Sequence, residues 1–195
     1  METCLEKLHD FPQYYKIPPH PSKGILARNF LFLYHFLFRK EYSIIKISML
    51  NLSFPNYEFR LKEINQKRFI FDEIRKKYIE LTPEEWVRQN CIKFLINEKK
   101  FKKNLISIEK KIRLNNTTKR FDILVHDING GCILLVECKA PNIKINQKSF
   151  DQILRYNQVI NAKFLMLTNG IIHYYCRINN DQKNIEFLKE IPVNK

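Results

Sequence analysis

The stretch FDILVHDINGGCILLVECK, residues 121–139, decides how this sequence is read. Two runs of branched apolar residues flank Asn129-Gly130, and an Asn-Gly pair in that setting is the strongest short-range sign of a β-hairpin with a two-residue turn. Counting outward from that turn places Asp122 opposite Glu137. The Cβ atoms of directly opposed residues lie about 5 Å apart. The sequence therefore predicts two carboxylates side by side on neighbouring strands.

A lysine completes this group, because Lys139 is two residues after Glu137 and projects from the same face of the strand. One interpretation is a cross-strand salt bridge on a solvated face, which contributes about 0 to 1 kcal/mol. Against it, the run Cys132–Val136 does not alternate and is typical of a strand buried on both faces. Charges at the end of a buried strand need compensation. A divalent cation, Mg²⁺ or Mn²⁺, between the two carboxylates is one way to supply it.

Composition and charge place the chain in a broad class. With 195 residues and 45% apolar residues, it is long enough for one well-filled domain. The formal net charge of +14 favours a polyanionic partner such as DNA, although an AT-rich genome would enrich lysine without any selection for binding. The five cysteines show no metal-binding spacing and are expected to be reduced thiols of a cytoplasmic protein.

The first 48 residues differ from the rest, so we predict an N-terminal extension, 1–48, and a domain, 49–195. Met49 is an alternative start of the protein. The aromatic run Phe30–Phe38 is too short for a membrane span, which needs about 20 residues. We therefore expect no membrane association, with an interfacial segment as the alternative.

The remaining pattern predicts alternating helices and strands. Thr82-Pro83 begins a helix that extends to about Lys99, with Thr as the N-cap. The other expected elements are a half-buried strand over Ile106–Leu114, the hairpin, a helix from Ser149 to about Asn161, a strand over Phe164–Leu167, a second hairpin at Asn169-Gly170 and a last strand over Ile185–Leu188. This order predicts an α/β fold with a mixed sheet flanked by helices.

The second helix carries two further polar candidates, Gln152 and Tyr156, which face the same way at i, i+4. Gln152 has a competing interpretation, because Ser149-x-x-Gln152 has the pattern of a capping box, which we favour when the residue is taken alone. The same ambiguity applies to Glu85, which follows Thr82 by three residues and is either a cap or a third acid near the metal.

Hydrolysis of a phosphodiester bond would use these groups best. It needs an activated water and charge neutralisation at the phosphate, which a metal and an adjacent amine can supply. All four glycines fall outside the nucleotide-binding loop patterns, so ATP is not an expected ligand. Candidates for phosphate contacts, each also explicable as a solvated charge, are Arg88, Arg120, Lys144 and Arg155.

These residues resemble the PD-(D/E)xK nuclease superfamily, in which Asp lies on the second core strand and Glu-x-Lys on the third. Phe121 stands where that motif has proline. More narrowly, the stretches Arg68–Tyr78 and Leu81–Gln89 are similar to small stand-alone proteins related to the N-terminal nuclease domain of the type I restriction enzyme R subunit. The resemblance covers about Met49 to Pro192.

The resemblance implies a restriction-endonuclease-like αβββαβ core. It also implies catalytic roles for Asp122, Glu137 and Lys139, with the two acids on Mg²⁺ and with Gln152 and Tyr156 in support. The motor and the specificity subunit of a type I enzyme are absent, so sequence-specific restriction by this chain alone is not expected.

Three functions follow as hypotheses. The first is a metal-dependent deoxyribonuclease, as a monomer or a homodimer. The second is a nucleic-acid-binding module on a nuclease fold that no longer cuts. The third is an interaction protein whose charge only follows genome composition. Metal-dependent cleavage supports the first, and salt-dependent binding without cleavage supports the second.

Overall fold

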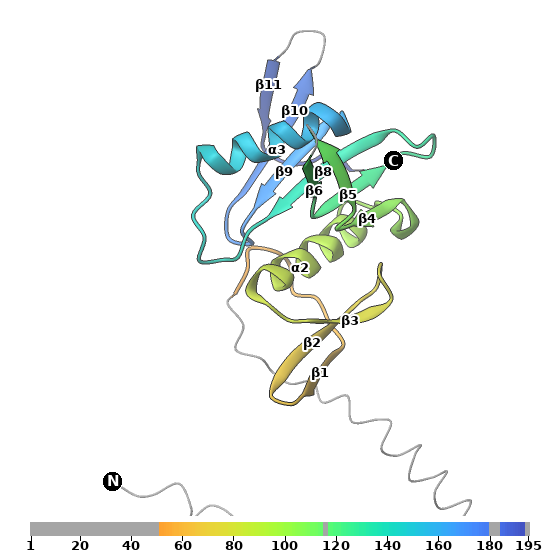
Figure 1. Ribbon diagram of the computed structural model, residues 1–195, viewed down its shortest axis with the longest axis vertical. Helices are drawn as coiled ribbons and strands as arrows, with labels where there is room; N and C mark the ends of the chain where they lie inside the picture. The colour runs from red at the N-terminus through yellow and green to blue at the C-terminus, as the bar shows by residue number, and fades with distance from the viewer. Residues whose placement is uncertain (1–50, 115–116, 180–183, 194–195) are drawn as a thin grey trace, which may run out of the picture. The chain divides into compact units, whose positions relative to one another are not determined.

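A six-stranded sheet with helices on both faces organises the chain in the computed structural model, which describes residues 51–114, 117–179 and 184–193 (Figure 1). The predicted extension, 1–48, and the alternative start at Met49 lie outside the described residues. None of the helices in the described ranges is long and apolar enough to cross a membrane.

The central sheet has the strand order β11-β10-β9-β8-β7-β4. Its strands are β4 (Ile106–Ile108), β7 (Ile123–His126), β8 (Cys132–Cys138), β9 (Phe164–Thr168), β10 (His173–Asn179) and β11 (Asn184–Leu188). β8 and β9 are parallel, whereas the other neighbours are antiparallel. The prediction of a mixed α/β fold is therefore confirmed. The second hairpin forms at the predicted place but with a longer turn, because Thr168 pairs with His173, and the last strand, β11, covers the predicted Ile185–Leu188.

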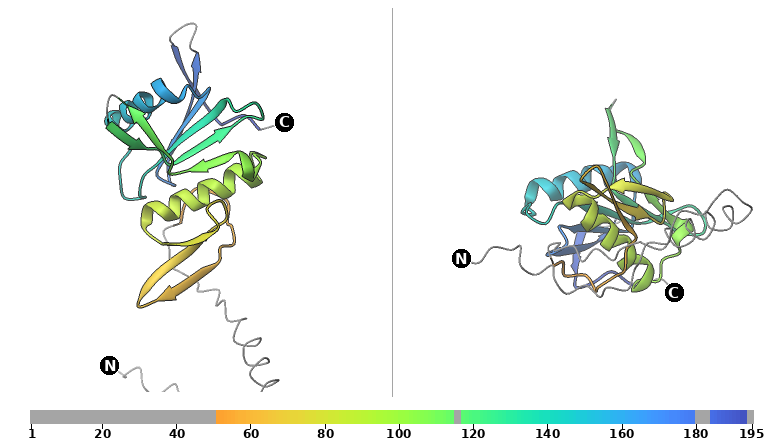
Figure 2. Two further views of the ribbon diagram at one scale, coloured as in Figure 1. Left: turned by 45° about the vertical axis from the view of Figure 1, so that its right-hand side comes forward. Right: turned by 90° about the horizontal axis from the view of Figure 1, so that it is seen from below.

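Strand β8 is buried on both faces, as its unbroken apolar run predicted. Leu134 and Val136 belong to a core shared with helix α2 (Pro83–Asn97), whereas Leu135 faces the core beneath helix α3 (Gln147–Ile160). Figures 1 and 2 show the two helices on opposite sides of the sheet. Residues of a strand alternate between the two faces, so Glu137 lies on the same side as Leu135, toward α3.

The first hairpin has the predicted register at its open end but a different turn. Ile123 pairs with Val136, so the register continues to Asp122 opposite Glu137. The turn is longer than the predicted two residues, because the Asp127 amide donates to the Gly131 carbonyl at 2.8 Å. Gly130 supplies the positive φ of 84° that this turn requires. A bulge between Val125 and His126 compensates, and restores the register before the acids.

The predicted single strand over Ile106–Leu114 is wrong. The chain bends at Glu109, which has a φ of 50°, and separates β4 from β5 (Lys111–Leu114). β5 pairs with β6 (Thr117–Arg120) in a two-stranded sheet that precedes Asp122. β4 is buried at all three residues, because it is covered by the core and not half exposed.

The helix starts follow local capping. Helix α2 begins as predicted, with Oγ1 of Thr82 accepting from the Glu85 amide at 3.1 Å. Helix α3 begins two residues earlier than predicted, because Asn146 is the N-cap and its side chain accepts from the Ser149 amide. The proposed capping box at Ser149 is therefore wrong, and the Gln152 side chain is free for another role.

A second sheet lies on the far side of α2 from the central sheet (Figure 2). Its strands are β1 (Leu61–Ile64), β2 (Lys67–Asp72) and β3 (Lys77–Glu80), all antiparallel, and the 3-10 turn η1 (Lys103–Leu105) lies before β4. The apolar run Phe69–Phe71 lies in β2. Ile70 and Asp72 are fully buried and belong to the face of the sheet that packs on α2.

The turn after β2 is tied to the rest of the fold by Glu73. Its carboxylate accepts from Lys93 at 2.6 Å and from Lys103, and these hydrogen bonds lower the pKa of Glu73 to about 2. A lowered carboxyl pKa contributes stability above its ordinary value of 4.5, which is lost as the pH falls toward 2.

We expect Glu73→Gln to lower the free energy of unfolding by about 1 kcal/mol near neutral pH, since a quarter of the side chain is exposed and solvent screens the pair. The difference from the wild type should shrink as the pH falls below about 4.5. Urea titrations followed by circular dichroism measure both. Glu186→Gln, in an exposed pair with Arg177, is the control with a smaller effect. A difference that does not change with pH would contradict this assignment.

Candidate active site

Two carboxylates meet at the open end of the β7–β8 hairpin. Glu137 is in β8 and 5% exposed, and Asp122 directly precedes β7. Oδ2 of Asp122 accepts a hydrogen bond from the Cys138 amide at 2.6 Å, which fixes the aspartate against the neighbouring strand. The hairpin pairing next to Asp122 and this side-chain hydrogen bond together hold the two acids on neighbouring strands.

Lys139 and Gln152 converge on one oxygen of Glu137. Nζ of Lys139 and Nε2 of Gln152 each donate to Oε1 of Glu137 at 2.6 Å. Gln152 is also 3.4 Å from Nζ of Lys139 through its carbonyl oxygen, and its amide donates to Oη of Tyr156 at 3.3 Å. The structure therefore brings together Glu137, Lys139, Gln152 and Tyr156 in one hydrogen-bonded group.

The pKa values of the ionisable side chains in this group are shifted because their charges are buried close together. Burial, and next the charges of Asp122 and Glu84, raise the pKa of Glu137 to about 7, although Lys139 opposes the shift. Burial lowers the pKa of Lys139, but the hydrogen bond and charge of Glu137 outweigh burial and hold that pKa above its ordinary value. The two acids thus repel each other in a site that excludes most solvent.

Arg88 of α2 joins the site from the opposite side. Its Nη2 donates to Oδ1 of Asp122 and to Oε1 of Glu84, both at 2.9 Å, and its Nη1 donates to Glu85. Burial opposes its charge, but the carboxylates around it, Asp122 first, raise the pKa of Arg88. Its Nε is buried with no hydrogen-bond partner. Arg88 is 4% exposed, so we place it in the interior of the site and not among the surface cations.

Glu85 is hydrogen-bonded to neither Asp122 nor Glu137 and reaches the site through Arg88. Its Oε1 accepts from Arg75 at 2.7 Å and from Gln89 at 2.8 Å. Arg75 in turn donates to Asp72 at 2.6 Å. A chain of buried ion pairs therefore leads from the small sheet across α2 to the candidate site.

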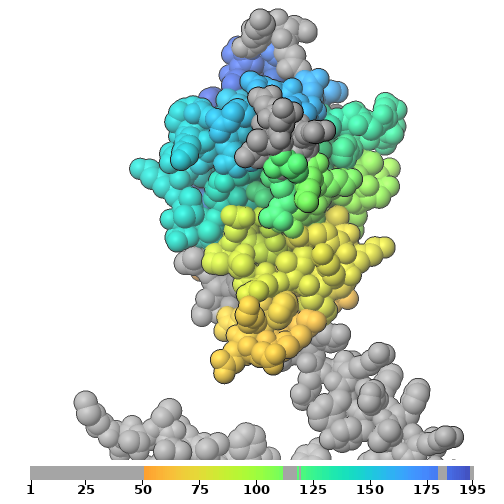
Figure 3. Space-filling model, viewed as in Figure 1, coloured from red at the N-terminus to blue at the C-terminus, as the bar shows by residue number. Residues whose placement is uncertain are grey.

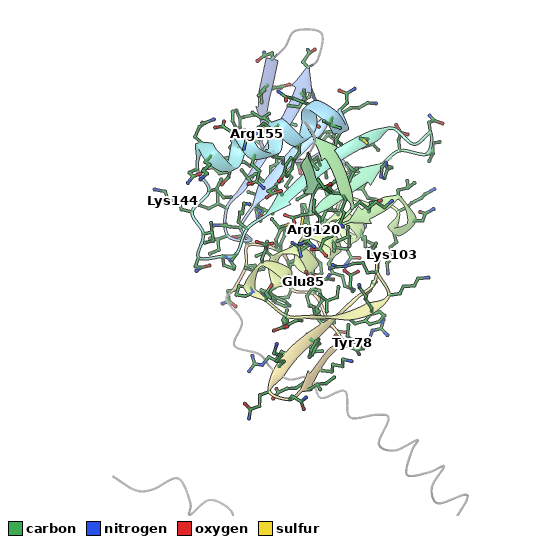
Figure 4. The ribbon with its side chains drawn as sticks, viewed as in Figure 1. Tyr78, Glu85, Lys103, Arg120, Lys144 and Arg155 are labelled. Carbon is green, nitrogen blue, oxygen red and sulfur yellow. The ribbon has the colours of Figure 1, made fainter. Side chains whose placement is uncertain are left out.

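The other predicted cations lie on the surface. Arg120, Lys144 and Arg155 are exposed, and Nη2 of Arg120 is 3.3 Å from Oε1 of Glu109. Figure 4 places Lys144 at the outer edge of the loop before α3 and Arg155 on α3. In the described part of the chain, none of the three is hydrogen-bonded or ion-paired with Asp122 or Glu137.

Sequence reasoning missed the ionic network around Arg88. The signal was available in the helix start Glu84-Glu85-Trp86-Val87-Arg88-Gln89, where acids precede Arg88 by three and four residues. Glu109 could not be found this way, because it reaches the same cluster only through the bend between β4 and β5.

The donor set is compatible with a hard cation of the Mg²⁺ type. Such a cation is usually held by one or two carboxylates, with water and substrate phosphate as the remaining ligands. Asp122 and Glu137 supply two carboxylates, and among the described residues no cluster of three or more His, Cys, Asp or Glu side chains has the arrangement of a complete metal cage. Two carboxylates fit such a cation as part of its ligand set, with the remaining ligands left to water and substrate.

The fold and the site define a class of protein. It is a mixed α/β protein in which two acids, a lysine and a glutamine are enclosed at adjacent strand ends. Residues 83–192, more than half of the chain, match the family described as "Type I restriction enzyme R protein N terminus". The chain belongs to that family. Comparison with curated proteins found no match.

Two solved structures are similar to parts of the chain. One is a fragment assigned to the HsdR subunit of a type I restriction enzyme from Vibrio vulnificus YJ016, with 20% identity, a TM-score of 0.38, and coverage of 52% of this chain and 22% of that one. The other, assigned as a nuclease of the DUF820 group from Anabaena variabilis ATCC 29413, has 14% identity, a TM-score of 0.37, and coverage of 64% and 80%.

Proposed function

We propose that this protein is a metal-dependent deoxyribonuclease of the PD-(D/E)xK type with a restriction-endonuclease-like core. The observation that carries the proposal is the convergence of Lys139 and Gln152 on Glu137, with Asp122 held opposite by the Cys138 amide. An exposed salt bridge needs no such enclosure. Membership of the family of type I restriction enzyme R protein N termini supports the same proposed function.

Each side chain has a role in phosphodiester hydrolysis. Asp122 and Glu137 would hold Mg²⁺ or Mn²⁺, and the bound cation would supply charge neutralisation at the phosphate and a more acidic water. Lys139 orients the attacking water and offsets charge that develops on the phosphate. Gln152 holds Glu137 in place, and Tyr156 holds Gln152.

DNA is the proposed substrate because the chain carries a formal net charge of +14. The exposed cations Arg120, Lys144 and Arg155 would contact the phosphate backbone. They would position the strand without reading its sequence.

A second function, nucleic-acid binding without cleavage, is favoured by one observation. Both oxygens of Asp122 already accept hydrogen bonds, from Arg88 and from the Cys138 amide. A cation at Asp122 has to compete with Arg88 for the oxygen Oδ1. If Arg88 keeps its hydrogen bond to Asp122, no cation binds at that oxygen, and the protein binds DNA without cutting it.

Cleavage assays separate the two functions. Plasmid and single-stranded DNA are incubated with the full chain and Mg²⁺, Mn²⁺ or EDTA, beside Glu137→Ala. A deoxyribonuclease cuts only with the cation, and Glu137→Ala abolishes cutting while the variant still binds DNA. Salt-dependent binding with no cutting under any condition supports the second function. Cutting that survives Glu137→Ala refutes the assignment of the site.

A further inference from the structure

Strands β5 and β6 form a separate hairpin, which we call the β5–β6 arm. The two strands pair with each other and with no other strand of the described residues. The right-hand view of Figure 2 shows the green arm extending outward from the central sheet, and in the space-filling view its green residues lie at the surface between α2 and α3 (Figure 3). A strand rises about 3.3 Å per residue, so each four-residue strand spans about 13 Å.

The arm and its base are strongly basic. Residues 110–120, KKIRLNNTTKR, contain five Lys or Arg residues and no Asp or Glu. Lys110, Lys111 and Arg120 are exposed. Arg120 pairs with Glu109 at 3.3 Å, so the segment keeps a surplus of positive charge even when this acid is included. Such a surplus is complementary to a phosphate backbone.

The register of the arm places several cationic positions on one face. Directly opposed residues of an antiparallel pair share a face, and so do residues two apart along a strand. Lys111 pairs with Arg120, and Arg113 pairs with Thr118. These four positions therefore belong to one face of the arm, which we call its cationic face, and none of them is apolar.

The base of the arm is joined to the candidate active site. The Glu109 amide donates to the Asp122 carbonyl at 3.0 Å, which closes the backbone across the base. Arg120, on the cationic face, pairs with Oε1 of Glu109, and the same oxygen is 3.8 Å from Nη1 of Arg88. Arg88 in turn binds Asp122. A nucleic acid that contacts the cationic face is consequently brought next to the acids of the site.

We propose that the β5–β6 arm lies in the major groove of duplex DNA, with the cations of its cationic face on the phosphates beside the groove. The major groove is about 12 Å wide and admits a two-stranded β-ribbon, whereas the minor groove is about 6 Å wide. A single strand offers no groove to the arm, so the duplex is the preferred form of DNA. The proposal rests on the proposed function for DNA as the partner, and adds which form of DNA the site receives.

Fluorescence anisotropy with a labelled duplex and its isolated strand tests the proposal on the full chain in EDTA, so that cleavage cannot interfere. The double variant with Lys110→Gln and Lys111→Gln should bind the duplex about 10- to 100-fold less tightly near 0.1 M salt, because each lost phosphate contact removes about one counterion release. The slope of log affinity against log salt should become shallower by about 2.

The matched control is the double variant with Lys76→Gln and Lys77→Gln. It removes another exposed Lys-Lys pair, and Lys77 begins β3 as Lys111 begins β5. Its affinity and salt slope should stay close to those of the wild type. A duplex with glucosylated 5-hydroxymethylcytosine tests the groove, because C5 of a pyrimidine faces the major groove and the sugar fills it. The wild type should bind this duplex less tightly than the unmodified one.

Three outcomes would overturn the proposal. The first is a folded Lys110 and Lys111 variant, with the circular dichroism spectrum of the wild type, that binds the duplex as tightly as the control variant. The second is binding of the single strand as tightly as the duplex. The third is equal binding of the glucosylated and unmodified duplexes.

Cleavage assays with Mg²⁺ separate this proposal from the proposed function. Duplex binding that depends on the arm, without any cleavage, supports the role of the arm and refutes the nuclease. Metal-dependent cleavage by a protein whose duplex binding does not depend on the arm refutes the role of the arm alone. Glu137→Ala is expected to bind the duplex as the wild type does, since the arm is unchanged in that variant.

Discussion

Replacing Lys139 by methionine is expected to reduce the rate of metal-dependent DNA cleavage by about 10²- to 10⁴-fold, the range typical of a positioned acid–base or electrostatic group. Methionine keeps the length of the side chain but removes the ammonium that donates to Glu137 at 2.6 Å. The affinity for DNA should change little, because one lysine among 34 Lys and Arg residues is lost.

Lys163→Met is the matched control for this experiment. Lys163 is exposed and precedes the start of β9, whereas Lys139 contacts the backbone of Thr168 at the other end of that strand. Single-turnover cleavage rates and binding isotherms separate catalysis from affinity. If Lys139→Met cuts as fast as Lys163→Met, Lys139 has no part in the reaction.

Replacing Arg88 by methionine is expected to lower the free energy of unfolding by about 3 to 5 kcal/mol, because removal of one partner leaves buried charges uncompensated. Arg88 is bonded to Glu84, Glu85 and Asp122, and its side chain is 5% exposed. Lysine should restore only part of the loss, since an ammonium cannot reproduce the planar fork of a guanidinium.

Urea unfolding of the metal-free protein measures this loss, with Arg120→Met as the control. Arg120 also pairs with a carboxylate of the cluster, Glu109, but is 61% exposed, and such pairs contribute about 0 to 1 kcal/mol. Equal losses in the two variants would show that the Arg88 network contributes no more than a surface pair.

The parts of the fold that were predictable from sequence rest on local signals. The start of α2 follows from Thr82 and Pro83, and the pairing of Ile123 with Val136, next to the two acids, follows from two apolar runs around a turn. The bend at Glu109 was not predictable, because a positive φ at a glutamate is imposed by the surrounding structure. The role of Gln152 was ambiguous for a related reason, since its pattern with Ser149 mimics a cap and the actual cap is Asn146.

The candidate site was predictable as a set of acids and a lysine but not as a network. The spacing of Glu137 and Lys139 along one strand was sufficient for that pair. The contact between Arg88 and Asp122 joins residues 34 positions apart and depends on how α2 crosses the sheet. Such a contact has no local signature in a single sequence.

The bulge between Val125 and His126 has an evolutionary consequence. It separates the tip of the hairpin, where Ile128 is 82% exposed, from the paired half that carries the acids. β8 is fixed on its other side by parallel pairing with β9, so gain or loss of a residue at the tip can be absorbed by the bulge. Homologous proteins can therefore differ in the length of this turn while the two carboxylates keep their alignment.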